Sequence, residues 1–264
     1  MKFSIITIAY NSGKTIERTI KSILSQTYSE YEYIIVDGAS KDNTIDIVKR
    51  YEPMFDGKMH WISEPDKGIY NAMNKGISMA KGDMVGIVNS DDWLDPDSLE
   101  NVKQCAETNN ANLYDAYIVT GQMLFHYSNG TSVVFKTNKQ SYEKYSRNYR
   151  MGLNHPATFV SKKVYDTIGV FDENFKLYAD ADLMVRCYQA RVPVYFIEKV
   201  LSNMADGGAS NVRSDASMHD NKYMLKKHTQ TKLEYCWVML KWHMLRLLKR
   251  LPYGWLMKFR EMTN

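Results

Sequence analysis

This sequence has few cysteines and only a small net charge, and each of these features excludes a class of protein. The 264 residues include only three cysteines, Cys105, Cys187 and Cys236, which stand far apart and form no CxxC pair. Neither a disulfide framework nor a thiolate zinc site is therefore expected, and the six histidines show no zinc-ligand spacing. A formal net charge of +4 is too mild to indicate nucleic-acid binding, so no nucleic-acid partner is expected.

The N-terminus lacks the apolar core of a signal peptide, because the first apolar run reaches polar residues already at Tyr10 and Asn11. No secretion is expected, and a reducing cytoplasm fits the cysteine content best. Hydrophobic residues make up 44% of the chain and charged residues 24%, as in globular proteins with one sizeable core. No internal repeat or low-complexity linker divides the sequence, so we expect one domain with an appendage.

The first hundred residues alternate short apolar runs with stretches of helical periodicity. Strands are expected at 3–9, 33–36, 60–63 and 84–88, with helices at 15–26, 42–51 and 69–80. Repeated strand–helix units predict a parallel sheet with helices on both faces. Ligands of such sheets bind beyond the carboxyl ends of the strands. The polar residues expected at that edge are Tyr10 and Asn11, Asp37, 64–66 and 89–92.

The second half of the chain changes to antiparallel signals. Stretches 117–127 and 131–136 flank Ser128-Asn129-Gly130, a strong hairpin turn, so the sheet is expected to become mixed there. Helices are expected at 162–168 and 182–190, with a strand at 194–197. From about residue 215 the chain is expected to be helical and is rich in Lys, Arg, Met and Trp.

The doublet Asp91-Asp92 follows the expected strand at 84–88 and precedes a helix start. Carboxylates at this position could hold Mg²⁺ or Mn²⁺, which stabilise negative charge on departing phosphates. Capping of the following helix explains the doublet alone equally well. Asp37 could accept hydrogen bonds from a base or a ribose, whereas stabilising the turn at Gly38 is the simpler role for that residue alone.

Four further groups are candidates for binding or catalysis, each with a structural alternative. Lys67, just before an expected helix, could meet phosphate, or it could belong to a solvated charged loop. Asp180 could act as a general base. Asp182, two residues later in an expected helix, points to another side and is not expected to share that role. Helix capping is the alternative for both residues. His155 beside Pro156 could bind acceptor or phosphate or be structural. The flexible pair Gly207-Gly208 could close over a diphosphate through its amides.

Taken together and in this order, these segments resemble glycosyltransferase family 2, a group of inverting enzymes with the GT-A fold. The resemblance runs from Phe3 to about Ser210, and its most specific parts are 4–11, 36–44, 66–70 and 89–93. It implies an α/β GT-A fold, with a mostly parallel mixed sheet flanked by helices and a C-terminal helical extension. Residues 1–110 would form the nucleotide-sugar-binding half of a catalytic domain, 111–212 its acceptor-binding half, and 213–264 a basic amphipathic tail.

The resemblance also implies roles for single residues. Asp180 would be the catalytic base, and Asp92, with Asp91, would hold Mg²⁺ or Mn²⁺. His155, Asp182, Gly207 and Gly208 would be possible contacts of the acceptor or the diphosphate. The residues that would bind the nucleotide-sugar, most simply a UDP-sugar, are Thr7, Ala9, Tyr10, Asn11, Asp37, Asp66, Lys67, Ser90 and Asp91.

Two positions depart from the family pattern. Asn89 replaces the first acid of the common Asp-x-Asp-Asp form, and it can accept a hydrogen bond but adds no negative charge. Ala179 replaces the acid of Glu-Asp-x-Asp, which leaves Asp180 aligned with the base. The expected function is that of an inverting transferase that acts on a hydroxyl of a glycan or lipid-linked acceptor in cell-surface polysaccharide biosynthesis. The two departures keep one alternative open, a catalytically silent nucleotide-sugar-binding subunit.

The C-terminal stretch 235–250 mixes large apolar groups with cations at helical spacing. Its Lys and Arg residues are too frequent for a membrane span, which needs about twenty mostly apolar residues. It could lie on an anionic membrane surface as a peripheral anchor, or pack on the catalytic domain or on a second subunit of a homodimer. Surface binding on the inner face of the cell membrane is the role we favour, because acceptors of the family are often lipid-linked.

Two other enzyme classes lack their required motifs here. A nucleotidyltransferase that makes nucleotide-sugars normally has a glycine-rich basic loop after the first strand, where this chain has Ala9-Tyr10-Asn11-Ser12-Gly13. A dinucleotide oxidoreductase would need GxGxxG at the same place, and the sequence has none there.

Overall fold

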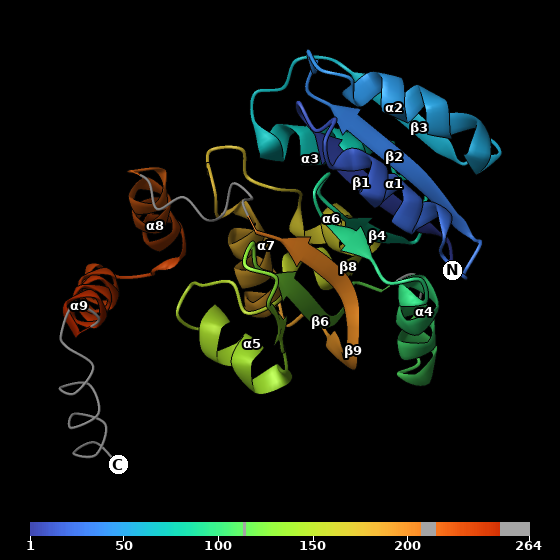
Figure 1. Cartoon of the computed structure of the whole chain (residues 1–264). Coiled ribbons are helices and arrows are strands. Elements are labelled where there is room, and N and C mark those ends of the chain that lie inside the picture. Colours follow the sequence, from blue (N-terminus) through green and yellow to red (C-terminus); the bar gives the residue numbers. More distant parts are fainter. Residues whose placement is uncertain (113–114, 207–214, 249–264) are drawn as a thin grey trace. The chain divides into compact units, whose positions relative to one another are not determined.

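The computed structural model describes residues 1–112, 115–206 and 215–248 (Figure 1). The chain divides into two compact units, Met1–Asp220 and Asn221–Asn264, which we treat separately. In the described part of the first unit, a single mixed sheet runs in the order β3-β2-β1-β4-β8-β6-β9-β5, and β7 pairs with β6. Its strands are β1 (Phe3–Ala9), β2 (Tyr31–Asp37), β3 (Met59–Ser63), β4 (Met84–Ile87), β5 (Trp93–Leu94), β6 (Ile118–His126), β7 (Ser132–Phe135), β8 (Thr158–Ser161) and β9 (Val194–Ala205).

Helices cover both faces of this sheet, as strand–helix alternation predicts. Helices α1, α2 and α4 share one core cluster with β1, whereas α3 lies on the opposite face, against Ile6 of β1 (Figure 1). The helices are α1 (Ile16–Leu24), α2 (Thr44–Tyr51), α3 (Ile69–Met79), α4 (Ser98–Thr108), α5 (Lys139–Ser146), α6 (Lys162–Ile168), α7 (Ala179–Gln189), α8 (Asp215–His228) and α9 (Lys232–Leu248), with short 3₁₀ turns η1 (Glu52–Phe55) and η2 (His155–Ala157).

The expected parallel half of the sheet is confirmed. Strands β1, β2, β3 and β4 pair in parallel, and β6 and β7 form the hairpin predicted around Asn129-Gly130. The expectations missed β5, β8 and α5, and β9 continues eight residues beyond the expected end at 197. The four-residue strand β8 was too short to show periodicity, and β5 has only two residues, so both depend on their partners in the sheet.

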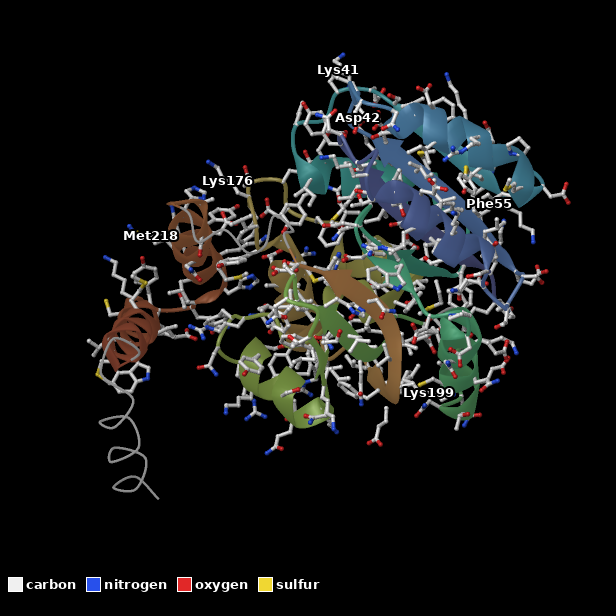
Figure 2. All side chains as sticks on the ribbon, viewed as in Figure 1. Lys41, Asp42, Phe55, Lys176, Lys199 and Met218 are labelled. Carbon is white, nitrogen blue, oxygen red and sulfur yellow. The ribbon has the colours of Figure 1, made fainter. Side chains whose placement is uncertain are left out.

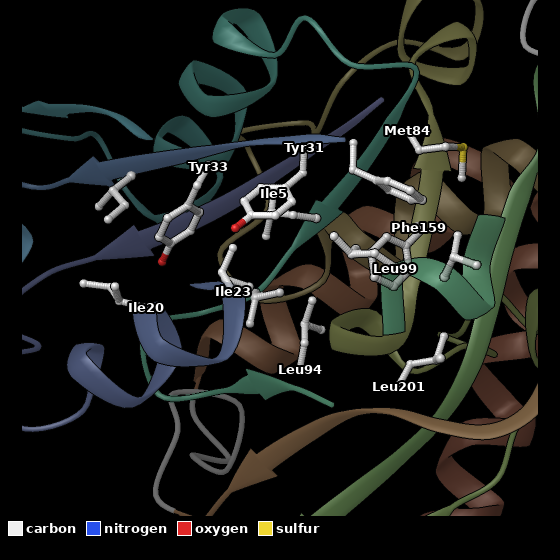
Figure 3. Packing of buried hydrophobic residues seen from close by; sticks show 14 of the residues in the cluster. Ile5, Ile20, Ile23, Tyr31, Tyr33, Met84, Leu94, Leu99, Phe159 and Leu201 are labelled. Atoms are coloured by element: carbon white, nitrogen blue, oxygen red, sulfur yellow. The ribbon is translucent and has the colours of Figure 1, made fainter. Parts of the chain in front are cut away.

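The change from parallel to antiparallel pairing occurs between β4 and β8, where Gly86 lies opposite Phe159. The Phe159 ring is buried in the core cluster with Ile5, Met84 and Leu99 (Figure 3). A Cβ atom added to Gly86 would lie only 2.6 Å from Cε1 of Phe159. Glycine at this position therefore makes room for the aromatic ring that joins the two halves of the sheet.

The second unit contains the end of α8 and the whole of α9. The α9 side chains of Leu233, Trp237, Leu240 and Met244 are 53–84% exposed, and Val238 is buried. These four residues recur at intervals of four, three and four, so they form one stripe along the helix. Among the helices that the structure describes, none is long and apolar enough to cross a membrane.

We expect Gly86→Ala to lower the free energy of unfolding by about 1–3 kcal/mol, because the added methyl overpacks the core against Phe159. Urea denaturation of the parent and the variant measures this difference. In a chain that already carries Phe159→Leu, the same substitution should cost less, since the smaller side chain leaves room. An equal cost in both backgrounds would contradict the proposed contact.

Candidate active site

The candidate site begins where β1 and β2 end. Tyr10, just after β1, exposes 66% of its surface, whereas Ala9 and Thr7 are buried below it. The Thr7 hydroxyl accepts a hydrogen bond from the hydroxyl of Tyr33 at 3.0 Å, and the Ala9 carbonyl accepts one from the Gly38 amide at 2.8 Å. Of the three predicted nucleoside-binding residues here, only Tyr10 therefore presents its side chain to a ligand, and Thr7 and Ala9 support it from below.

Asp37 is fully buried at the end of β2 and is the centre of a polar network. Its carboxylate accepts hydrogen bonds from the amide of Ser40 at 2.9 Å, from the hydroxyl of Ser40, and from the hydroxyl of Ser63 at 2.6 Å. The Ser40 hydroxyl also accepts a bond from the Asn11 amide at 2.8 Å, and Asn11 Oδ1 accepts one from the Lys41 amide. The network fixes the ends of three neighbouring strands to one another.

The loop after this network leads into α2 at Lys41 and Asp42 (Figure 2). The Asp42 carboxylate accepts a hydrogen bond from the Gly13 amide at 2.9 Å, which ties this loop to the loop after β1. The pKa of Asp42 lies below its ordinary value, chiefly because the Thr44 hydroxyl donates a hydrogen bond to the carboxylate. The rim of the site is thus fixed by side-chain bonds to backbone amides.

Asp66 lies beside Tyr10 and Gly38, because a Cβ added to Gly38 would be 3.1 Å from Asp66 Oδ2 and 3.3 Å from Tyr10 Cδ2. The ammonium of Lys75 lies 2.7 Å from Asp66 Oδ1 and 2.7 Å from Glu64 Oε1. The sequence pattern alone did not single out Lys75, since its partners come from the loop before its helix. The predicted Lys67, by contrast, has an exposed side chain.

The acidic segment 89–92 follows β4, and contacts from the first strand–helix unit hold it. The hydroxyls of Ser12 and Ser90 are hydrogen-bonded at 2.7 Å. Arg18 of α1 donates to the Asp91 carbonyl at 2.7 Å, and its guanidinium lies 3.6 Å from the centre of the Trp93 ring. Neither Ser12 nor Arg18 was predicted as a site residue, because their partners lie more than 70 residues away.

Asp92 is fully buried, whereas Asp91 is only partly so. Asp92 Oδ2 accepts a hydrogen bond from the Asn89 side-chain amide at 3.2 Å. Burial first, and then the charge of Asp91, raise the pKa of Asp92 to about 8, although Asn89 and Arg18 act in the opposite direction. A carboxyl group with this pKa holds its proton at neutral pH in the absence of a cation.

The oxygens of this segment fit a divalent cation. Within residues 1–112, 115–206 and 215–248, the buried atoms Asn89 Oδ1 and Asp92 Oδ1 have no hydrogen-bond partner. Unpartnered buried acceptors are costly, and hard oxygen donors are the ligands that Mg²⁺ and Mn²⁺ prefer. No group of three or more His, Cys, Asp or Glu side chains that could hold a metal occurs in the described chain. Further ligands of the cation would therefore come from the phosphates.

A second cluster surrounds Asp180, in the first turn of α7. Its Oδ1 accepts a hydrogen bond from the Ala181 amide at 2.8 Å, and the neighbouring Tyr70 hydroxyl acts to lower the pKa of the carboxyl. Burial raises the pKa of Asp180 above its ordinary value, and the neighbouring His155 counteracts this shift. Burial also lowers the pKa of His155. The structure thus brings the predicted base and the predicted His155 together, with Tyr70 as an additional member.

Strand register brings this second cluster towards the acidic segment. His155 precedes β8, which runs antiparallel to β4 with Gly86 opposite Phe159. The residues before β8 therefore run alongside those that follow β4. Val85, Ile87 and Phe171 help to line an apolar pocket around His155. This apolar lining is the physical reason why the ionised form of His155 is disfavoured.

Asp182, predicted as a possible contact of acceptor or diphosphate, takes part in a buried ion pair. It is fully buried, and Arg186 donates to its Oδ2 from Nε at 2.8 Å. The same guanidinium donates to the carbonyls of Ile168 and Val170. The buried ion pair thus fixes the loop after α6, and a contact of Asp182 with a ligand stays a prediction. The other predicted contacts, Gly207 and Gly208, lie outside the described residues.

Comparison with known proteins identifies the family. The model of Glycosyl transferase family 2 matches residues 4–169, more than half of the chain. The chain belongs to glycosyltransferase family 2. It is therefore a glycosyltransferase, as the motifs predicted. The family match ends before α7, so it does not reach Asp180, whose role as the base stays a prediction.

Relatives of this family 2 chain are also glycosyltransferases. A PGL/p-HBAD biosynthesis glycosyltransferase of Mycobacterium bovis is 28% identical over 220 residues, which cover 81% of this chain and 80% of the relative. An uncharacterized glycosyltransferase of Mycobacterium tuberculosis is 41% identical over 90 residues, which cover 34% of this chain and 33% of the other.

Solved structures confirm the GT-A fold. Residues 1–349 of S. aureus TarS, in complex with UDP-GlcNAc, superpose with a TM-score of 0.68 at 19% identity, covering 90% of this chain and 70% of that one. This chain spans only 41% of a longer TarS structure. The mannosyltransferase PcManGT of Pyrobaculum calidifontis, in complex with GDP-Man and Mn²⁺, has a TM-score of 0.63 at 15% identity, covering 89% and 66%.

Asp92 gives a testable pH dependence of stability. The unfolded chain ionises this carboxyl near pH 4, whereas the folded chain keeps its proton up to about pH 8. Its contribution to stability is thus complete below about pH 4 and is lost as the pH rises to about 8, by up to about 1.4 kcal/mol per pH unit. We expect Asp92→Asn to be increasingly more stable than the parent over this range, as measured by urea denaturation with EDTA.

The matched control for this experiment is Asp46→Asn, which makes the same chemical change at an exposed position of α2. Its free energy of unfolding should stay within about 0.5 kcal/mol of the parent, as is usual for a substitution at an exposed position. Parallel curves for Asp92→Asn and the parent would show that Asp92 is ionised in the folded chain, against this prediction.

Proposed function

We propose that this glycosyltransferase moves a sugar from a nucleoside-diphosphate sugar to a hydroxyl of a glycan or lipid-linked acceptor, with inversion at the anomeric carbon, in cell-surface polysaccharide biosynthesis. The observation that carries the mechanism is the cluster of Asp180, Tyr70 and His155. Burial raises the pKa of the Asp180 carboxyl towards the range in which a base is both deprotonated and able to accept a proton. A base of this kind is needed on the acceptor side.

In this mechanism Asp180 accepts the proton of the acceptor hydroxyl as that oxygen attacks the anomeric carbon. The hydrogen bond from the amide of Ala181 orients the Asp180 carboxylate, and Tyr70 lies beside it. His155 lies beside the base, and burial lowers its pKa, which favours the neutral imidazole.

On the donor side, the exposed ring of Tyr10 and the neighbouring Asp66 and Gly38 would receive the base and ribose. A UDP-sugar is the donor that we propose, in keeping with the UDP-GlcNAc complex of TarS. Asp91 and Asp92, with Asn89, would hold Mg²⁺ or Mn²⁺, which when bound stabilises charge on the departing nucleoside diphosphate. Asp91 is the more accessible carboxylate and would lie nearer the phosphates.

The test compares release of nucleoside diphosphate by the parent, Asp180→Asn and the control Asp46→Asn, with Mg²⁺ or Mn²⁺ and with EDTA. UDP-GlcNAc, UDP-glucose, GDP-mannose and a dTDP-sugar are the donors to screen, first by thermal stabilisation of the protein. We expect turnover of Asp180→Asn to fall by about two orders of magnitude or more, with donor binding nearly unchanged. In the parent, the rate should rise with pH through a pKa above the ordinary aspartate range.

Two results would overturn this assignment. Unchanged turnover in Asp180→Asn would exclude Asp180 as the base. Donor binding without release of nucleoside diphosphate by the parent would identify a catalytically silent subunit, the alternative that Asn89 and Ala179 suggest.

We also propose that the second unit binds an anionic membrane surface, where a lipid-linked acceptor would be found. Residues 221–264 include ten Lys and Arg residues but only two Glu. The exposed stripe of Leu233, Trp237, Leu240 and Met244 supplies an apolar face on α9. Apolar side chains that enter the interface and cations that attract anionic lipids reinforce each other. Pairing two copies through this unit would bring like charges together, so a homodimer through α9 is disfavoured.

Flotation with vesicles tests this membrane contact. The intact chain should float with vesicles that contain phosphatidylglycerol and stay soluble with pure phosphatidylcholine, because the attraction is electrostatic. A chain ending at Thr229 and the double variant Trp237→Ser/Leu240→Ser should both remain largely soluble, and high salt should release the intact chain. Equal soluble recovery of all three proteins would count against the contact, and self-association of the intact chain without vesicles would point to a second subunit.

A further inference from the structure

Asp220, near the start of α8, is a fully buried carboxylate that binds three consecutive backbone amides. Its Oδ2 accepts hydrogen bonds from the amides of Lys176 at 2.9 Å, Leu177 at 2.6 Å and Tyr178 at 3.1 Å. Its Oδ1 lies 3.1 Å from Nδ1 of His219. Lys176, labelled in Figure 2, marks the loop that carries these amides. All of these residues belong to the unit Met1–Asp220.

The bonds to Asp220 satisfy groups that would otherwise be costly. A buried carboxylate needs hydrogen bonds to offset the loss of water, and hydrogen bonds from three amides to one charge are strong. The three amides stand immediately before α7, which begins at Ala179, where no earlier helical turn provides acceptors for them. The carboxylate and the loop therefore stabilise each other.

A second contact joins the same two segments. The hydroxyls of Ser217 and Tyr178 are hydrogen-bonded at 2.6 Å. Ser217 and Asp220 are three residues apart in α8, so both face the loop from the same side of that helix. The start of α8 is thus fastened to residues 176–178 through a side chain as well as through the backbone.

This loop determines where Asp180 lies. Tyr178 is two residues before Asp180, and its carbonyl accepts a hydrogen bond from the Asp182 amide at 2.9 Å, in the first turn of α7. Earlier in the loop, the Asn74 side chain donates to the carbonyl of Phe171 at 2.9 Å and accepts from its amide at 3.0 Å. Asp220 provides the last of these attachments before the base.

We propose that Asp220 is a positioning residue for Asp180: it holds residues 176–178 so that α7 begins at the point from which the Asp180 carboxylate reaches Tyr70 and the acceptor. This inference rests on the proposed role of Asp180 as the base. Loss of the Asp220 carboxylate leaves the donor site on β1, β2 and β4 unchanged, and it affects the proton transfer. A small displacement of a catalytic group is enough to reduce the rate by orders of magnitude.

The experiment measures kcat, donor KM and the pH dependence of kcat for Asp220→Ala, Asp220→Asn and Ser217→Ala, with the donor that the parent hydrolyses fastest among the four screened. Asp46→Asn is the control for the change of charge. We expect Asp220→Ala to lower kcat about ten-fold to a hundred-fold, with donor KM within about two-fold of the parent. Asp220→Asn, whose amide oxygen can still accept from the loop, should lose less, and Ser217→Ala least.

A double variant separates positioning from general loss of stability. If Asp220 acts through Asp180, Asp220→Asn should lower kcat in the parent but add nothing further when Asp180→Asn is already present. Independent losses that multiply in the double variant would overturn the proposal, as would a parent-like kcat and pH profile in both Asp220→Asn and Ser217→Ala. Since Asp180→Asn alone tests the proposed base, failure of that assignment and failure of this inference give different results.

Discussion

The pairing of β4 with β8 is the contact on which the arrangement of the site depends. The four parallel strands β1 to β4 carry the proposed donor side, and the antiparallel partner β8 reverses direction beside β4. Gly86 makes this approach possible, because any larger residue would meet the ring of Phe159. The reversal carries His155 back towards the segment that follows β4. The segments proposed to bind the donor and to carry the base, about 90 residues apart in the sequence, therefore come to one edge of the sheet (Figure 1).

The buried carboxylates differ in whether their oxygens have hydrogen-bond partners within the protein. Asp37, Asp182 and Asp220 are fully buried and held by serines, by Arg186 and by three amides, respectively. Such groups stabilise loops because their hydrogen bonds offset the cost of losing water. Asp92 is equally buried, but its Oδ1 has no partner in the described part of the chain. An unsatisfied buried acceptor costs about 1–3 kcal/mol, a cost that a bound cation or proton can offset.

The sequence allowed the family, the GT-A fold and the enzyme class to be predicted, and all three are confirmed. The parallel strands were visible because each is a short apolar run followed by a helix of clear period. Tyr10, Asp37, Asp66 and the acidic segment were likewise expected at strand ends. Less visible were Arg18, Lys75, Tyr70 and Asp220, because a residue that acts through a distant partner carries no local signal. The ion pair of Asp182 was not expected for the same reason, since its partner Arg186 also binds a loop outside α7.

By itself, then, the sequence determined which elements form and which chemical groups stand at their ends, since both follow from local periodicity and the order of strands and helices. Only the tertiary structure decided how each group is used. Burial separates Asp92 from Asp91 and raises its pKa, although the two are neighbours in the chain. The tertiary structure also places Asp180 beside His155 and Tyr70, whereas Asp182 forms a salt bridge with Arg186. Solvation and partners differ because they depend on segments that meet only after folding.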